Sequence, residues 1–172
     1  MEAKQKWIAD PVHSEIGFKV KHMMISTVSG NLNDFDVKVE TEGEDFNSAN
    51  VNFSAKIDSI NTKNNDRDNH LKSADFFDAE NHPEMTFVSK SFNGETLTGD
   101  LTIRGTTKEI DLDVDFNGII QDPYGQTKAG FEISGAVSRK EFGLNWNALT
   151  EAGSVVVSDK VRLSIDLQLV KQ

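Results

Sequence analysis

The stretch EIDLDVDFNG, residues 109–118, alternates between apolar and acidic side chains up to its phenylalanine. In an extended strand successive side chains point to opposite faces, so the apolar residues share one face and the aspartates the other. The apolar set is Ile110, Leu112, Val114 and Phe116. A period of two is typical of a strand with one face in a core and one in water. The stretch therefore predicts a half-buried β-strand.

The same alternation recurs along most of the chain. It is strict in residues 15–22, 51–57, 96–105, 129–137 and 160–170, and looser in 28–40 and 84–92. About eight strands are therefore expected, separated by turn signals such as FNGET, RGTTKE and DPYG. Between Leu32 and Phe35 the apolar phase slips by one residue beside Asn and Asp, which predicts a bulge or bend.

The connections between these strands favour antiparallel neighbours, because parallel pairing needs long crossovers. About eight consecutive antiparallel strands favour a closed barrel, which leaves no exposed strand edge. A two-sheet sandwich is the alternative. The length of 172 residues suits one domain, which we expect to span 1–172.

Two segments interrupt the alternation. In the first, residues 61–83, Asn65 or Asp66 is suited to cap a short helix around 66–77, and Pro83 prevents its continuation. The second segment, residues 141–153, carries too many apolar side chains for a solvated linker. We expect it to fold back on the barrel.

Composition argues against several classes of partner. Eighteen Lys and Arg against 28 Asp and Glu give a formal net charge of −10, which disfavours nucleic acid and anionic membrane surfaces. The chain has no cysteine and no apolar run long enough for stable membrane insertion. Its opening residues, MEAKQKWIAD, lack the apolar region of a secretory signal. A cytoplasmic location is expected, or a periplasmic one if a signal has been removed.

Catalytic and metal-binding motifs are not evident. The four histidines lack the close pair spacing of zinc ligands, although a site assembled from His70, His82 and a carboxylate stays open. No nucleophile elbow or phosphate-binding glycine loop is present. We expect no cofactor, no metal and no enzymatic activity. A hydrolase or metalloenzyme using His13, His22 or His70 ranks last among the hypotheses.

The inward rows mix aromatic and small side chains. The chain has 11 phenylalanines, and several fall on inward rows that also carry glycine or alanine, such as Gly99 and Ala129. An eight-stranded barrel has an interior that side chains can fill or that can hold one small ligand. Periodicity leaves both possibilities open. His22 ends one inward row and is either a paired histidine near the rim or a polar contact at a cavity mouth.

Several motifs resemble the YceI-like family, in order and over nearly the whole chain. They are WIADPVHSEIGFKVKH (7–22), VSGNLNDFD (28–36), INTKNNDRDNHLKSADFFDAENHPEMTFVS (60–89), GDLTIRGTTKEIDLDV (99–114) and SRKEFGLNWN (138–147). The resemblance implies an all-β, eight-stranded antiparallel barrel of lipocalin-like architecture with an inserted helix. It also implies a long-chain apolar ligand in the lumen, such as a polyisoprenoid, isoprenoid quinone or fatty-acid-like lipid. Members of the family are often homodimers and often periplasmic.

The leading hypothesis is therefore a non-catalytic carrier, and the alternative is a stress-related interaction domain with a solid core. In the helical segment, Asp66, Arg67 and Asp68 are expected to form a charge-assisted cluster at the helix start. Leu71, Phe76 and Phe77 would then close or line one end of the lumen. The residues predicted to contact the ligand are Phe18, Val20, His22, Phe53, Leu71, Phe76, Phe77, Phe87, Leu101, Ile103, Phe131, Ile133, Phe142 and Trp146.

Overall fold

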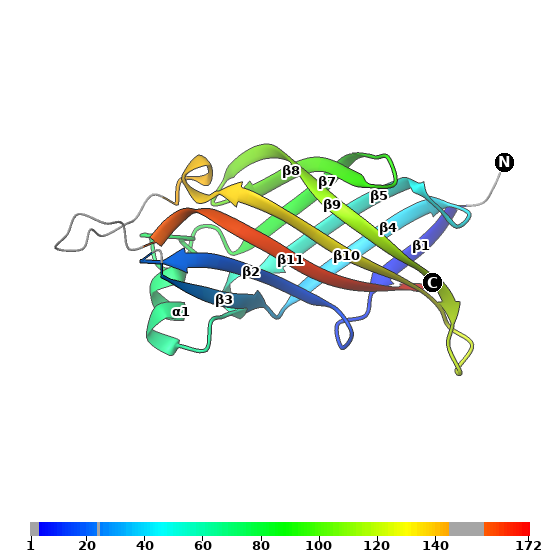
Figure 1. Cartoon of the computed structure of the whole chain (residues 1–172), viewed down its shortest axis with the longest axis horizontal. Coiled ribbons are helices and arrows are strands. Elements are labelled where there is room, and N and C mark those ends of the chain that lie inside the picture. The colour runs from blue at the N-terminus through cyan, green and yellow to red at the C-terminus, as the bar shows by residue number, and fades with distance from the viewer. Residues whose placement is uncertain (1–3, 24, 145–156) are drawn as a thin grey trace.

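The strand order of the protein closes on itself (Figure 1). The structure is a computed structural model and describes residues 4–23, 25–144 and 157–172. Its elements are β1 (Lys4–Ala9), β2 (Glu15–His22), β3 (Ser26–Leu32), β4 (Phe35–Glu42), β5 (Asp45–Lys56), the 3-10 turn η1 (Ile57–Ser59), β6 (Ile60–Asn61), α1 (Asn65–Lys72), β7 (Glu84–Phe92), β8 (Thr96–Ile103), β9 (Thr106–Gln121), β10 (Thr127–Ser138), the 3-10 turn η2 (Arg139–Phe142) and β11 (Val157–Lys171).

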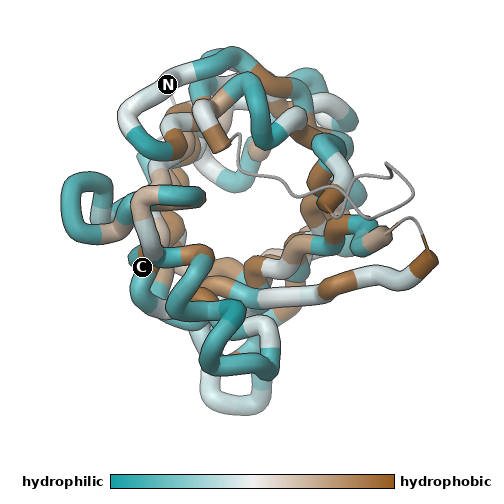
Figure 2. Tube along the Cα trace, turned by 90° about the vertical axis from the view of Figure 1, so that its left-hand side faces the viewer, coloured by the Kyte–Doolittle hydropathy of each residue, from teal (hydrophilic) through white to brown (hydrophobic). Residues whose placement is uncertain are grey.

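Eight strands form the ring. They follow the order β1-β4-β5-β7-β8-β9-β10-β11, each antiparallel to its neighbours, and β11 returns to β1 through pairs such as Trp7 with Lys171. The end-on view shows the strands arranged around a central axis (Figure 2). The prediction of a closed eight-stranded antiparallel barrel is confirmed, and the sandwich alternative is wrong.

The three remaining strands extend the wall at one end of the barrel. β2 pairs with β11, β3 pairs with β2, and β6 pairs with β3. Residues 28–40, predicted as one strand with a bulge or bend, form two strands, because β3 pairs with β2 and β6 whereas β4 pairs with β1 and β5. The break lies at Asn33 and Asp34, where the sequence predicted a change of phase. The Asn33 amide donates to the Ser59 carbonyl and the Asp34 carbonyl accepts from the Lys56 amide, so the kink is held by neighbouring backbone.

Two strands were not predicted. β1 reads KQKWIA, in which Trp7 is fully buried but Ile8 is 42% exposed, so no apolar alternation marks it. β6 is only two residues long and its pairing with β3 alone defines it. Both depend on partners far away in sequence, which a local pattern does not record.

The helix α1 is shorter than the predicted range 66–77 and is capped differently. Asn64, not Asn65 or Asp66, is the N-cap, and its side chain accepts a hydrogen bond from the Arg67 amide. The helix ends at Lys72 because Ser73 is extended and bonds back to the His70 carbonyl through its hydroxyl and its amide. No helix among the described residues is long and apolar enough to cross a bilayer.

The predicted charge cluster at the helix start is only partly correct. Asp68 is buried and accepts hydrogen bonds from both the amide and the hydroxyl of Thr62. The Arg67 side chain donates to the hydroxyl and the carbonyl of the same threonine. Asp66 is exposed and takes no part in these bonds. The cluster therefore centres on Thr62, which joins α1 to the end of β6.

An aromatic cluster packs at the end of the barrel opposite α1, where β1 begins and β11 ends (Figure 1). Phe46 is the centre: its ring lies 4.9 Å from that of Trp7, 5.0 Å from Phe131 and 5.5 Å from Phe116. The indole of Trp7 donates to the hydroxyl of buried Thr41, so its polar group is satisfied inside the core. Aromatic side chains therefore occupy much of this end of the barrel.

Candidate ligand-binding cavity

The barrel encloses an apolar cavity of about 180 Å³. Its wall is made by the inward rows of the strands, together with the segment after α1 and the turn η2. Among the described residues, Arg139 is the only charged or polar side chain that lines it. Because apolar side chains make the rest of the wall, the cavity favours a ligand that needs no hydrogen-bond partner.

The cavity runs from the α1 end toward the middle of the barrel. Leu71, Phe76 and Phe77 lie at the α1 end, whereas Val37 and Leu97 line it farther in. A second cavity of about 50 Å³ continues toward the aromatic cluster. The two cavities share the lining residues Val51, Leu97, Ile133 and Leu167.

Glycines in the wall allow phenylalanine rings to lie along it. A Cβ atom on Gly30 would come 2.4 Å from Cζ of Phe18, and one on Gly99 would come 2.5 Å from Cζ of Phe87. Each ring therefore covers the position that a side chain on the neighbouring strand would occupy. The mixture of large and small residues packs in the wall and still leaves space in the lumen, so the alternative of a solidly packed core does not describe this barrel.

Most of the residues predicted to contact a ligand lie on the wall of the larger cavity. They are Phe18, Val20, Phe53, Leu71, Phe76, Phe77, Phe87, Leu101, Ile103, Ile133 and Phe142. Their role in binding stays a prediction. Trp146 lies outside the described residues.

Two predicted residues lie elsewhere. His22 is half-buried and lines neither cavity, although Val157, its cross-strand partner on β11, lines the larger one. Phe131 lines only the smaller cavity and packs against Phe46 and Phe116 in the aromatic cluster. Parity places both on an inward row, but an inward position alone does not bring a side chain to the larger cavity.

Arg139 is the residue that sequence reasoning missed. It is 3% exposed, and its guanidinium donates to the carbonyls of Leu144, Val157 and Ser158. Burial lowers the pKa of this guanidinium, although the nearby carboxylate of Asp159 opposes the change. An arginine that follows a strand usually faces water, so the alternation pattern did not predict that Arg139 is buried. Only its place in the SRKEFG motif singled it out in the sequence.

Arg139 and Arg104 hold the segments around the α1 end. Arg139 joins Leu144, which follows η2, to the first residues of β11. Arg104 has a left-handed backbone at the turn between β8 and β9, and its side chain donates to the carbonyls of Phe76 and Gly143. The apolar residues at this end are therefore positioned by hydrogen bonds to their own backbone.

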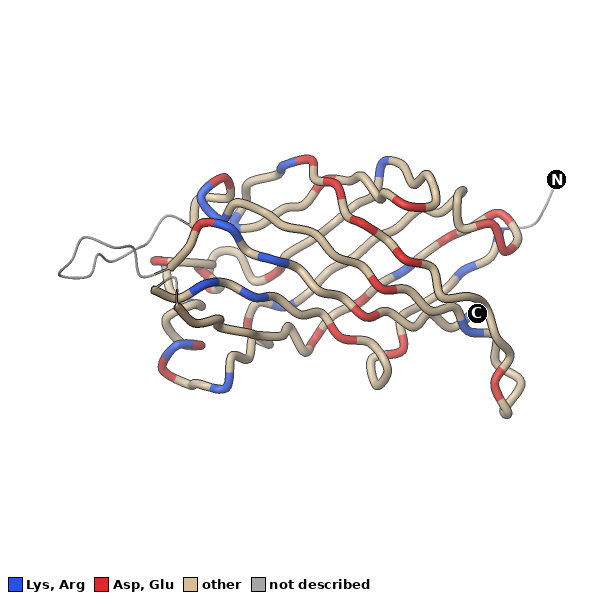
Figure 3. The backbone as a smooth tube through the Cα atoms, in the orientation of Figure 1, with Lys and Arg blue, Asp and Glu red and all other residues tan. Residues whose placement is uncertain are grey.

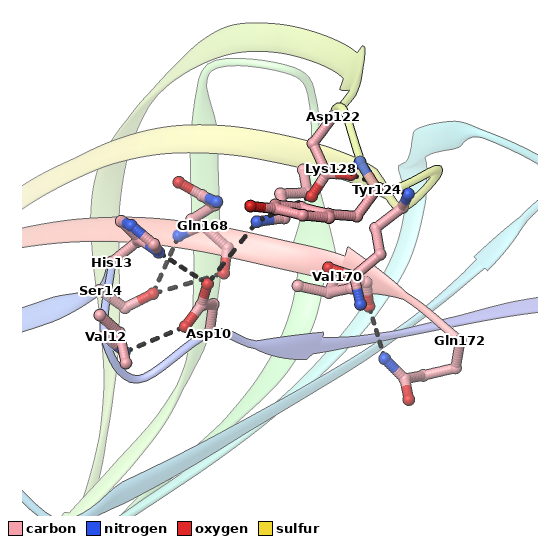
Figure 4. A network of polar contacts seen from close by, with 11 residues as sticks. Asp10, Val12, His13, Ser14, Asp122, Tyr124, Lys128, Gln168, Val170 and Gln172 are labelled. Carbon is pink, nitrogen blue, oxygen red and sulfur yellow. Dashed lines mark hydrogen bonds and ion pairs between the residues drawn. The ribbon is translucent and has the colours of Figure 1, made fainter.

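The chain has a second polar cluster, on the outside of the barrel (Figure 4). Asp10 bonds to the ring of His13 at 2.8 Å, and Lys128 lies within 3.9 Å of Asp10 and 3.2 Å of Asp122. The hydrogen bond from His13 lowers the pKa of Asp10 against the opposing effect of partial burial. None of these residues lines a cavity. The network joins the corner between β1 and β2 to the β9–β10 hairpin.

The remaining histidines that were considered as ligands have other surroundings. His70 bonds to Asp75 at 2.9 Å and its ring meets that of Phe76 edge-on. His82 lies beside Gly105, where an added Cβ would come 3.0 Å from the imidazole. Within residues 4–23, 25–144 and 157–172, no three side chains of the ligand-forming kinds come together in a way that could hold a metal ion.

Comparisons with known proteins agree with this architecture. The chain is 43% identical over 158 residues to a UPF0312 protein of Staphylococcus epidermidis, covering 91% of this chain and 92% of the relative. The crystal structure of the Campylobacter jejuni YCEI protein is 34% identical, with a TM-score of 0.75 and coverage of 95% of this chain and 96% of the other.

One further solved structure is similar in fold although its sequence identity is low. A polyisoprenoid binding domain from Saccharophagus degradans has a TM-score of 0.74 at 14% identity, covering 96% of this chain and 98% of that domain. The model of the YceI-like domain matches residues 7–169, from the buried tryptophan of β1 to the buried leucine near the end of β11. Because that match takes in every strand of the closed ring, the chain belongs to the YceI-like family.

Proposed function

We propose that this protein is a non-catalytic carrier that holds one long, neutral, apolar chain, of the isoprenoid or acyl type, in its lumen. The single observation that carries the proposal is the apolar cavity of about 180 Å³ inside a closed barrel. The polyisoprenoid binding named for the S. degradans domain supports the same class of ligand. The isoprenoid type is preferred for this reason.

Burial of hydrocarbon supplies the driving force. Each methylene removed from water contributes about 0.8 kcal/mol, so about ten of them supply about 8 kcal/mol before the costs of association. Micromolar affinity corresponds to about 8 kcal/mol after those costs, so the bound chain has to bury more than ten methylenes in a preformed site. The cavity is close in size to apolar cavities of about 150 Å³ that bind benzene. A longer chain therefore extends toward the α1 end or displaces the residues there.

The surroundings of Arg139 support a neutral ligand over a fatty acid bound by its carboxylate. Each of its guanidinium nitrogens donates to a backbone carbonyl, at 2.6 to 3.1 Å. The larger cavity exposes no polar surface, so a carboxylate inside the lumen would lose its water without gaining a hydrogen-bond partner. A polar headgroup is expected outside the cavity.

Extraction of the purified protein with organic solvent, followed by mass spectrometry, identifies whatever the lumen holds. Titration of the delipidated protein with an isoprenoid quinone then measures affinity. We expect Ile133→Phe, which fills the lumen, to weaken binding at least tenfold. Ser134→Phe adds the same ring on the outer face of β10 and should leave binding unchanged. Recovery of no lipid, together with no uptake of quinone or acyl chains, would refute the proposal.

Transport of the chain between sites, and formation of a homodimer, belong to the same proposal. Light scattering on the eluting protein measures the oligomeric state directly. Transfer of a labelled quinone between donor and acceptor vesicles measures transport.

A further inference from the structure

Four exposed cations lie together on the outer wall of the barrel. They are Lys19 and Lys21 of β2 and Lys160 and Arg162 of β11, and we name them the basic patch. Lys19 and Arg162 are direct cross-strand partners. Like charges placed opposite each other are destabilising, so this arrangement is not explained by the stability of the sheet.

The patch has no neighbouring acid on the strands that flank it. On β3, Lys19 and Lys21 pair with Ser29 and Thr27, and on β10 the partners of Arg162 and Lys160 are Ala136 and Ser138. None of the four cations forms an ion pair with another described residue. Asp159, which precedes Lys160 on β11, accepts hydrogen bonds from the Ser138 hydroxyl and the Lys140 amide, so four cations outnumber this one acid on this part of the wall.

The acids on the same wall are collected farther along it. Asp115, Glu132, Asp166 and Glu15 form a continuous row of cross-strand partners over β9, β10, β11 and β2. Four residues along β11 separate Arg162 from Asp166, a distance of about 13 Å at the rise of a strand. The wall is therefore positive toward the α1 end and negative toward the opposite end (Figure 3). The helix α1 and the turn η2 carry both signs: Asp66 precedes Arg67 in α1, and Glu141 follows Lys140 in η2.

The hairpin that continues β2 into β3 presents apolar side chains at the same end. Ile25 is 84% exposed and Met23 is 40% exposed, directly beyond Lys19 and Lys21 along the strand. The hairpin and α1 lie at the same end of the barrel (Figure 1), where the larger cavity is lined by Leu71 and Phe76. Cations next to exposed aliphatic side chains are the combination found in segments that lie in a membrane interface.

We propose that this end of the barrel docks on an anionic lipid bilayer. The basic patch contacts the phosphate groups, and Ile25 and Met23 enter the interface. A planar bilayer meets only the α1 end of the barrel, so the row of acids farther along the wall lies away from the bilayer surface. A long polyanion such as nucleic acid would lie along the wall and meet that row. An acidic protein would satisfy the cations but gives no role to the exposed aliphatic side chains.

The test uses the full chain and sedimentation with vesicles of phosphatidylcholine, with or without phosphatidylglycerol. Binding is expected only with phosphatidylglycerol and should weaken as salt is raised, because exposed charges are screened. The triple variant Lys19→Gln, Lys21→Gln, Arg162→Gln should lose about 100-fold in partitioning, from the typical contribution of a basic residue near such a surface. Ile25→Ser should reduce binding without changing its salt dependence.

The matched control is the triple variant Lys4→Gln, Lys6→Gln, Lys38→Gln, which has the same net charge but changes exposed lysines on β1 and β4. It should bind as the unaltered chain does. Equal loss in both triple variants, binding to neither kind of vesicle, or retention of binding by the first variant would each overturn the proposal. The assay needs no ligand in the lumen, so its failure would leave the carrier proposal standing.

Discussion

The ring of Phe18 covers the Cα position of Gly30, its direct partner on the neighbouring strand. A methyl group on Gly30 would come 2.4 Å from Cζ of Phe18 and 2.8 Å from Cγ2 of Thr62. The ring can lie along the wall only because its partner has no side chain. This pair is one reason why a barrel with several inward phenylalanines keeps an internal space.

Gly30→Ala should therefore push the Phe18 ring toward the lumen. We expect a loss of about 1–3 kcal/mol in the free energy of unfolding, typical of overpacking, together with weaker binding of an apolar ligand. Urea denaturation and ligand titration measure the two effects. Gly130→Ala is the control, because its added methyl has an ordinary contact of 3.6 Å with Asn117. If a second substitution, Phe18→Leu, restores neither quantity, the proposed clash is wrong.

Arg139→Met should destabilise the protein by about 2–4 kcal/mol, because it leaves buried carbonyls without their donors. Lysine should not rescue the loss, since one ammonium group cannot reach three carbonyls in the geometry of a guanidinium. Chemical denaturation of both variants provides the measurement. Full stability in Arg139→Lys would show that charge alone, and not the set of hydrogen bonds, is what matters.

The stabilising contribution of Asp10 should be lost in acid. Its hydrogen bond with His13 lowers its pKa in the folded state below the usual 3.8, so folding favours the ionised carboxylate. The resulting stability is fully present above about pH 4 and is lost as the pH falls through the lowered pKa. Thermal unfolding between pH 2 and pH 6 would show a smaller acid-dependent loss in Asp10→Asn. The same change at exposed Asp36 should leave the profile unaltered.

Arg104→Ala should speed the exchange of a bound ligand. The side chain holds the carbonyls of Phe76 and Gly143, at 3.0 and 3.2 Å, and both segments border the α1 end of the cavity. Losing hydrogen bonds from a charged donor should raise the dissociation rate by about tenfold. Stopped-flow displacement of a fluorescent apolar chain measures this rate. An unchanged rate would mean that ligands leave by another route.

Much of the barrel could be predicted from local pattern. Alternation marked the long strands β7 to β11, because half-buried strands need a period of two. It also located the kink between Leu32 and Phe35. The helix was predicted in the right place but too long. Its end depends on the hydrogen bonds from Ser73 to the His70 carbonyl, which the sequence pattern does not reveal.

The sequence by itself determined which side chains face inward and which face water, because parity along a strand needs no knowledge of its neighbours. Tertiary structure alone decided what those faces meet. Closure of β11 onto β1 and its pairing with β2 bring Arg162 beside Lys19, 143 positions away in the chain, and pairing of β2 with β3 sets Phe18 over Gly30. The space in the lumen and the charge on the wall are properties of such cross-strand pairs, and no single strand carries them.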